Sequence, residues 1–226
     1  MKPRVLERFD KDILLYHESM DSVVRLQEEK GKCSITIKLK YNSKPFLITD
    51  RDFDEYSFSK EIVIKSDFQY LEIGPGLSAF TPRMVEYKLK KKPIIIEPID
   101  YSLLKELLTE VSSLELKTSF KERIETLIKR CEFFSDPDKV YHIKKTLGEA
   151  LVENEELKGI ADVVVDHFGA TAYAYFTDEE ILNTEKVIEL ERVLLKESGE
   201  LFHTNIIDPV YLEPRNRFFI TSRGFL

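Results

Sequence analysis

The expected fold follows from one stretch, Tyr70-Leu71-Glu72-Ile73-Gly74-Pro75-Gly76-Leu77-Ser78-Ala79. Its first four residues have the composition of a short buried strand, and they lead directly into a turn that contains two glycines. Thr81-Pro82 follows, and a capping residue before a proline is typical of a helix start. Glycines let the backbone turn sharply and let a ligand approach without a clash with Cβ. The chain has only 8 glycines in 226 residues, so we interpret this strand-turn-helix as a candidate binding loop.

Beyond this loop, short apolar strands alternate with helical patterns. The predicted strands are Pro93–Glu97, Val140–Ile143, Ala161–Val165 and Glu200–Thr204. Nearly continuous Val, Ile and Leu predicts strands that are buried on both faces. Alternation with helices predicts a parallel sheet with right-handed crossovers. We expect two of the helices to begin at capping boxes, Ser119–Glu122 and Thr177–Glu180. The fold expected for residues 67–226 is therefore α/β, with a doubly wound, Rossmann-like and mostly parallel sheet.

The chain before residue 67 has a different pattern, and we interpret it as an N-terminal extension. Residues 10–29 carry apolar side chains near helical spacing and predict an amphipathic helix that ends at Gly31. Residues 34–40, 45–49 and 61–65 predict short antiparallel strands. The domain prediction is thus an extension over residues 1–66 and a ligand-binding domain over 67–226. We also expect the polar and aromatic residues 51–58 to cover the ligand pocket. The alternative is that the extension packs on a sheet edge and only stabilises the fold.

Composition excludes several classes of protein. Lys+Arg 34 against Asp+Glu 41 gives a net charge of −7, which argues against an extensive interface with duplex nucleic acid. No apolar run approaches the roughly 20 residues that span a bilayer, and residues 1–8 lack the apolar core of a signal peptide. Cys33 and Cys131 are too few for a disulfide framework or a typical zinc site. We expect a cytoplasmic protein without membrane contact and without a metal site.

In doubly wound folds, ligands bind at the carboxyl ends of the strands. The first such end is the Gly74–Gly76 turn, and the second is Glu97, which lies 21 residues beyond Gly76. A carboxylate there can accept hydrogen bonds from both hydroxyls of a ribose. Together they predict an adenosine-containing ligand. Gly74-x-Gly76-x-x-Ala79 with Glu97 also fits a nicotinamide dinucleotide, although the Glu72 carboxylate would repel a diphosphate.

A family resemblance favours S-adenosylmethionine as the ligand. Leu71–Leu77 resembles the first motif of class I S-adenosylmethionine-dependent methyltransferases, especially that of the ribosomal RNA adenine dimethylases. Ile94–Pro98, Leu147–Leu151 and Ala161–Asp166 resemble the second, third and fourth motifs, and Leu194–Leu201 is similar to the turn before the fifth strand. The resemblance covers about residues 67–206 and implies a methyltransferase with S-adenosylmethionine as its cofactor.

The resemblance also implies roles for individual residues. Glu72 would lie near the methionine ammonium group, Glu97 would bind the ribose, and Glu149 would meet the adenine amino group. The cofactor loop would contain Gly74, Gly76 and Ser78, and Asp166 would contact the cofactor from the fourth strand. Asp166 and His167 would then be the catalytic candidates nearest the transferred methyl group. His167 is the better base, because its ordinary pKa lies near neutrality.

The chain departs from the family in three places. Ser78 replaces the third glycine of the first motif, and Asp166-His167-Phe168-Gly169-Ala170 stands where the adenine dimethylases have Asn-x-Pro-aromatic. Only residues 207–226 follow the fifth strand. The methyl acceptor therefore stays open, small molecule or macromolecule, as does the oligomeric state. Two alternatives are a catalytically silent S-adenosylmethionine-binding protein that acts through interaction, and a nicotinamide-dependent oxidoreductase.

Overall fold

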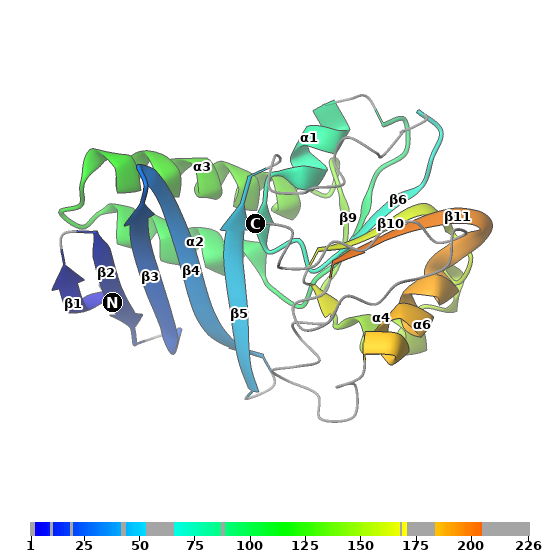
Figure 1. Cartoon of the computed structure of the whole chain (residues 1–226), viewed down its shortest axis with the longest axis horizontal. Coiled ribbons are helices and arrows are strands. Elements are labelled where there is room, and N and C mark those ends of the chain that lie inside the picture. Colours follow the sequence, from blue (N-terminus) through cyan, green and yellow to red (C-terminus); the bar gives the residue numbers. More distant parts are fainter. Residues whose placement is uncertain are drawn as a thin grey trace.

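The computed structural model describes residues 3–9, 11–18, 20–41, 44–52, 66–86, 89–167, 169–170 and 184–204. Two sheets lie beside each other (Figure 1). The first has six strands in the order β1-β2-β3-β4-β5-β7, and the second has five strands in the order β11-β10-β6-β8-β9. The strands of the first sheet are β1 (Arg4–Phe9), β2 (Asp12–His17), β3 (Ser22–Glu29), β4 (Lys32–Tyr41), β5 (Lys44–Arg51) and β7 (Leu77–Ser78).

The helix predicted over residues 10–29 is wrong, because this segment forms β2 and β3 of an antiparallel meander. Its apolar residues satisfy a period of two as well as a helical period. Ile13 and Leu15 are buried on one strand and Val24 and Leu26 on the next, while the residues between them are more exposed. Pairing with neighbouring strands favours the strand over the helix here. This is a tertiary effect, and the spacing of apolar residues within the segment does not indicate it.

Gly31 does not end a helix but completes a hairpin turn. Lys30 and Gly31 both have positive φ, 51° and 77°, and they connect Glu29 of β3 directly to Lys32 of β4, which pair with each other. A two-residue loop with positive φ at both positions matches the right-handed twist of the strands it joins.

The second sheet is entirely parallel, which confirms the expected α/β class. Its strands are β6 (Tyr70–Ile73), β8 (Ile94–Ile96), β9 (Tyr141–Ile143), β10 (Ala161–His167) and β11 (Leu195–Thr204), and each neighbouring pair runs in parallel. All residues of β6 and β8 are buried, as is most of β10. β9 lies at the edge and is more exposed.

Helices cover both faces of the parallel sheet. Those that pack on it are α1 (Phe80–Glu86), α4 (Leu147–Glu153) and α6 (Thr184–Leu194), and η2 (Glu155–Leu157) follows α4. Phe80 and Met84 of α1 join Val163 and Val165 in one cluster, whereas α4 and α6 pack with Val164 on the opposite face. Figure 1 shows α1 on one side and α4 with α6 on the other.

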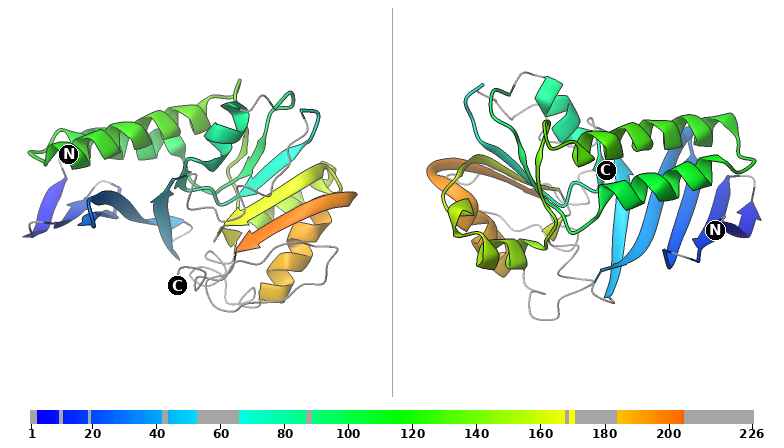
Figure 2. Two further views of the ribbon diagram at one scale, coloured as in Figure 1. Left: turned by 45° about the horizontal axis from the view of Figure 1, so that its top comes forward. Right: turned by 180° about the vertical axis from the view of Figure 1, so that it is seen from behind.

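The two remaining helices, α2 (Tyr101–Ser112) and α3 (Thr118–Ser135), cover one face of the six-stranded sheet (Figure 2). The core between them includes Leu107, Phe120 and Leu127 from the helices and Leu26 and Ile37 from the strands. These helices come from beyond the predicted boundary at residue 66. The N-terminal sheet and the later part of the chain therefore share one core.

Several predicted details differ from the structure or lie outside the described residues. The capping box at Ser119–Glu122 is wrong, since α3 begins at Thr118 after Lys117, with no side-chain cap. α1 begins at Phe80, so Thr81 lies inside the helix. Residues 53–58, 61–65, 177–180 and 207–226, on which predictions were also made, fall outside the described part of the chain. In the described part, no helix has the length and apolar character that a membrane span requires.

Candidate functional site

The Gly74–Gly76 turn lies at the carboxyl end of β6, as predicted. Both glycines have positive φ, 60° and 54°, which is a conformation that other residues adopt only at a cost. The Gly74 N–H donates to the Ile96 carbonyl oxygen at 2.9 Å, and Ser78 N–H donates to the Pro75 carbonyl oxygen at 3.0 Å. The first bond ties the turn to the end of the neighbouring strand β8.

Glu97 follows β8 and meets this turn directly. Its Oε2 accepts a hydrogen bond from the Gly76 N–H at 3.0 Å, and the residue is fully buried. The Tyr101 hydroxyl at the start of α2 donates to the Gly76 carbonyl oxygen at 2.8 Å. The structure therefore brings together two residues predicted separately from the ends of two strands, and it adds Tyr101 as a third.

The other side of the turn contacts the N-terminal sheet. A Cβ placed on Gly76 would lie 3.2 Å from the Thr49 carbonyl oxygen of β5. Next to it, Leu77 and Ser78 form β7, which pairs in parallel with Asp50 and Arg51. The extension therefore contacts the candidate binding loop through its backbone, and Gly76 needs to be glycine for both its φ and this close approach.

An ion-pair network fixes this junction to α3. Arg123 Nε donates to Asp50 Oδ2 at 2.6 Å, and Arg123 Nη1 donates to Asp52 Oδ1 at 2.8 Å. Arg130 donates to the same Asp52 oxygen at 2.9 Å and to the Leu77 carbonyl oxygen at 2.7 Å. Burial raises the pKa of Asp50 even though Arg123 opposes the shift. Burial also disfavours the charged form of Asp52, but the hydrogen bonds and charges of Arg123 and Arg130 outweigh this effect and lower its pKa.

Glu72 and Ser78 lie together on the α1 face of the parallel sheet. The Glu72 carboxylate is buried and accepts hydrogen bonds from the Tyr70 hydroxyl at 3.3 Å, from the Ser78 hydroxyl at 3.4 Å and from Thr81 Oγ1. Ser78 Oγ also accepts from the Phe80 N–H at 3.2 Å at the start of α1. Both predicted residues thus hold the loop and helix in place, and Thr81 supports Glu72 rather than capping the helix.

Glu149 belongs to a capping box at the start of α4. Thr146 Oγ1 accepts from the Glu149 N–H at 3.4 Å, and Glu149 Oε2 accepts from the Thr146 N–H at 2.9 Å. The side chain is only partly buried. This reciprocal cap explains the residue by local structure, and its predicted contact with adenine stays a prediction.

Asp166 and His167 end β10 and point to opposite faces of the sheet, as successive strand residues do. Asp166 is fully buried, and its carboxylate oxygens accept hydrogen bonds from the Gly169 and Ala170 N–H groups of its own turn. His167 is also buried, at 7% exposure. Of the predicted site residues, the structure brings Gly76 close to Glu97 and Ser78 close to Glu72, whereas Asp166 and Glu149 each cap a separate turn.

Two polar residues that the sequence analysis did not identify lie beside Asp166. His203 of β11 is its register partner across the parallel pair, and Glu191 of α6 approaches His203 Nδ1 to 2.8 Å. No local motif indicates them, because their proximity depends on strand register and on the rotation of α6. An alternation of Leu201 and His203 on one face of the strand was the only available signal.

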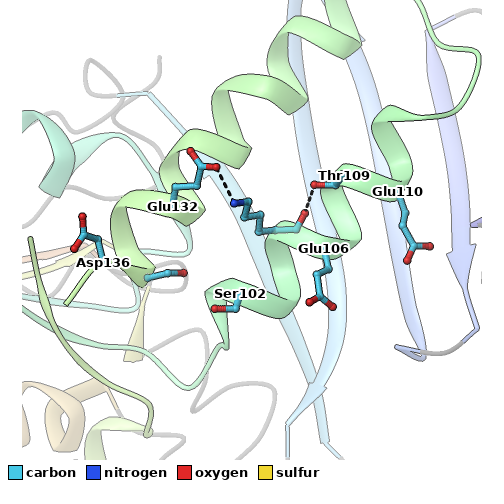
Figure 3. Close-up of a pocket in the computed structure, with 8 residues that line it drawn as sticks. Ser102, Glu106, Thr109, Glu110, Glu132 and Asp136 are labelled. Carbon is cyan, nitrogen blue, oxygen red and sulfur yellow. Dashed lines mark hydrogen bonds and ion pairs between the residues drawn. The ribbon is translucent and has the colours of Figure 1, made fainter. Parts of the chain in front are cut away.

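A separate groove of about 620 Å³ lies between α2 and α3. Figure 3 shows its acidic lining, which includes Glu106, Glu110, Glu132 and Asp136. Lys105 Nζ forms an ion pair with Glu132 Oε1 at 2.8 Å. These side chains belong to the solvated outer faces of two helices, and carboxylates alone do not make a binding site. The groove is lined by residues of α2 and α3 and is not part of the site at the ends of β6 and β8.

Comparisons with protein-family models, with curated protein sequences and with solved structures found no match.

Proposed function

We propose that the protein binds S-adenosylmethionine at the carboxyl ends of β6 and β8 and acts as a methyltransferase on a doubly wound fold. The strand order supports this proposal. From β6 the chain proceeds to β8 and β9 on one side, and it then continues with β10 and β11 on the other side. Such a reversal is the switch point at which open α/β sheets bind their ligands.

The observation that carries the proposal is the contact between the Gly76 N–H and Glu97 Oε2, at 3.0 Å. It brings a carboxylate to a glycine turn at the ends of two adjacent parallel strands. A carboxylate in this position suits a ribose, whose two hydroxyls are donors. Glu72 lies in β6, two residues before Gly74, and would supply the negative charge that the ammonium end of S-adenosylmethionine requires, whereas a dinucleotide diphosphate would be repelled.

The chemistry asks little of the protein beyond alignment. S-Adenosylmethionine carries an activated methyl group on a sulfonium, and transfer is an in-line displacement that depends on the position of the nucleophile. A general base is needed only for a protonated acceptor. His167 stays the candidate for that role. Asp166 is assigned the positioning of the turn after β10, because each of its oxygens accepts one backbone N–H group of that turn. The acceptor stays open.

A second candidate is a protein that binds the cofactor or its product without turnover and acts through interaction. The sequence after β10 favours this candidate, because the acceptor motif of the adenine dimethylases is missing there.

Calorimetric titration with S-adenosylmethionine, S-adenosylhomocysteine and NAD tests the proposal. We expect the first two to bind with one molecule per chain and NAD not to bind. Glu97→Gln keeps an acceptor for the Gly76 N–H but removes the charge, and should weaken binding roughly 10-fold to 100-fold, because hydrogen bonds to charged groups contribute about 1.5–3 kcal/mol.

Glu106→Gln on the exposed surface of α2 is the matched control and should bind as the unaltered chain does. Binding of NAD alone would overturn the proposal, as would unchanged affinity in a Glu97→Gln variant with a normal melting temperature. Binding without methyl transfer to small-molecule, protein or RNA acceptors would favour the second candidate.

A further inference from the structure

Three ionisable side chains from three different elements meet in the interior behind β10. Asp166 ends β10, His203 lies opposite it on β11, and Glu191 reaches them from α6. The side chains of all three residues are fully buried, with 0% of their surface exposed to solvent. Buried carboxylates are rare unless they are paired or bind a metal, so this cluster requires a physical explanation.

The donor atoms are spaced as the ligands of one small cation are. His203 Nδ1 lies 2.8 Å from Glu191 Oε2 and 3.9 Å from Asp166 Oδ2. One donor atom from each residue lies within 4.8 Å of the others. With metal–ligand distances of about 2.1 Å, neighbouring ligands are about 3.0 Å apart in an octahedral site and about 3.4 Å apart in a tetrahedral site. The observed separations of 2.8 Å and 3.9 Å lie below and above these two ligand–ligand distances.

We infer that Asp166, Glu191 and His203 form a binding site for one divalent transition-metal cation. The site holds its cation inside the domain, between β10, β11 and α6, and it does not depend on the proposed methyltransferase activity. The Cys33 and Cys131 thiols are not part of it. One imidazole nitrogen with two carboxylate oxygens suits zinc or manganese better than magnesium or calcium, which take oxygen ligands.

Charge balance supports the assignment. Asp166 and Glu191 place two carboxyl groups in a region without solvent, where charges are costly unless they are compensated. One divalent cation compensates both carboxylates, and the imidazole of His203 completes the set of donors.

The surrounding backbone holds one ligand in a fixed orientation. Both oxygens of Asp166 accept N–H groups, from Gly169 and from Ala170, the latter at 2.9 Å. Gly169 in turn packs so closely on β6 that an added Cβ would lie 2.2 Å from the Ile73 carbonyl oxygen. Hydrogen bonds to a ligating carboxylate are the usual means by which proteins orient metal ligands.

The experiment measures metal uptake by the full chain. The purified protein is stripped with EDTA, incubated with zinc or manganese chloride, and passed through gel filtration before elemental analysis. We expect about one equivalent of zinc or manganese per chain and a melting temperature raised by several degrees, because a ligand that binds only the folded state stabilises it. An uptake below about a tenth of an equivalent of either metal would overturn the inference.

Substitutions locate the site. Glu191→Gln and His203→Asn should each lower the affinity by about 100-fold or more, since even altered orienting groups cost up to about 100-fold. Glu189→Gln on the exposed side of α6 and His142→Asn in β9 are matched controls, and both should bind normally. Equal affinity in Glu191→Gln and in the unaltered chain would contradict the assignment.

X-ray absorption of the zinc-loaded chain decides the question even where a variant fails to fold. We expect a shell of oxygen and nitrogen donors at about 2.0–2.2 Å that includes imidazole scattering. A sulfur donor near 2.3 Å, or a shell without imidazole, would place the metal elsewhere and overturn the inference.

Discussion

Replacing Arg123 with methionine tests whether the ion-pair network holds the N-terminal sheet to α3. Arg123 contacts Asp50 at 2.6 Å, and the two side chains are only 14% and 2% exposed. Methionine keeps much of the side-chain length and removes the charge. Asp50 then stays buried without the guanidinium that offsets its desolvation, whereas Asp52 keeps Arg130 at 2.9 Å.

The expected cost comes almost entirely from Asp50. Removing one partner of a buried ion pair typically costs about 3–5 kcal/mol, because the remaining charge is uncompensated. Asp52 is 35% exposed and keeps a partner, so it adds little. Asp50 can also take up a proton, which limits the penalty. We therefore expect Arg123→Met to lower the free energy of unfolding by about 3 kcal/mol at pH 7.

The loss of stability in Arg123→Met should also depend on pH, in a direction set by the pKa of Asp50. The pKa of Asp50 is already raised by burial, and the loss of Arg123 raises it further. Between its unfolded and folded pKa values the folded chain binds more protons than the unfolded chain, so stability increases as pH falls. The deficit of Arg123→Met should therefore narrow between pH 7 and pH 5.

Urea unfolding followed by circular dichroism measures both effects. Arg83→Met is the matched control, because Arg83 and its partner Glu86 are 54% and 66% exposed, and it should change stability by less than about 0.5 kcal/mol. A cost below about 1 kcal/mol for Arg123→Met, or a deficit that widens on acidification, would show that this network does not hold the sheet to α3.

The remaining predictions concern the Gly76 turn and the capping box at the start of α4. Gly76→Ala should cost at least about 1 kcal/mol more than Gly31→Ala in urea unfolding, since both strain a positive φ but only Gly76 also faces backbone at 3.2 Å; equal costs would exclude the contact with β5 as a constraint. Thr146→Ala should lower stability by about 1 kcal/mol through loss of the α4 cap. Glu149→Gln should change it by less than about 0.5 kcal/mol, because glutamine also completes a capping box, and a larger loss would mean that the carboxylate charge has another structural role.

The parallel sheet was predictable because its strands carry their own signal. Ile94–Ile96 and Val163–Val165 are apolar at every position, and only a strand buried on both faces requires this. Turn residues between them set the spacing of strands and helices. The predicted strands after residue 67 therefore coincide with β6, β8, β9, β10 and the second half of β11, whereas no element was predicted at β7, α4 or η2.

The N-terminal sheet was not predictable in the same way. Residues 12–29 fit two periods, and the choice between helix and strand depends on partners that are distant in the sequence, including β4 and the face of α2 and α3. His17 is an example. It is buried because it meets Glu110 of α2 at 3.0 Å, 93 residues away, and nothing in its own segment indicates that contact.

The residues of the candidate sites also fall into two groups, those whose proximity the sequence indicates and those that only the three-dimensional structure brings together. Gly74, Gly76 and Glu97 follow strands directly, so their meeting follows from the order of the strands alone. Glu191 and His203 meet only because of the register between β10 and β11 and the rotation of α6. We expected no metal site because the chain has only two cysteines, Cys33 and Cys131, and that argument does not address a site built from histidine and carboxylates.

Hydrogen exchange with and without saturating S-adenosylhomocysteine tests the central claim most directly, because it reports where the ligand binds. We predict slower exchange in residues 74–78 and 97–101, where Gly76 N–H, Glu97 and Tyr101 meet, and unchanged exchange in β3 and β4. NAD at the same concentration should leave both segments unaffected. Unchanged exchange in residues 74–78 and 97–101 at saturating S-adenosylhomocysteine would contradict the claim that the ends of β6 and β8 form the cofactor site.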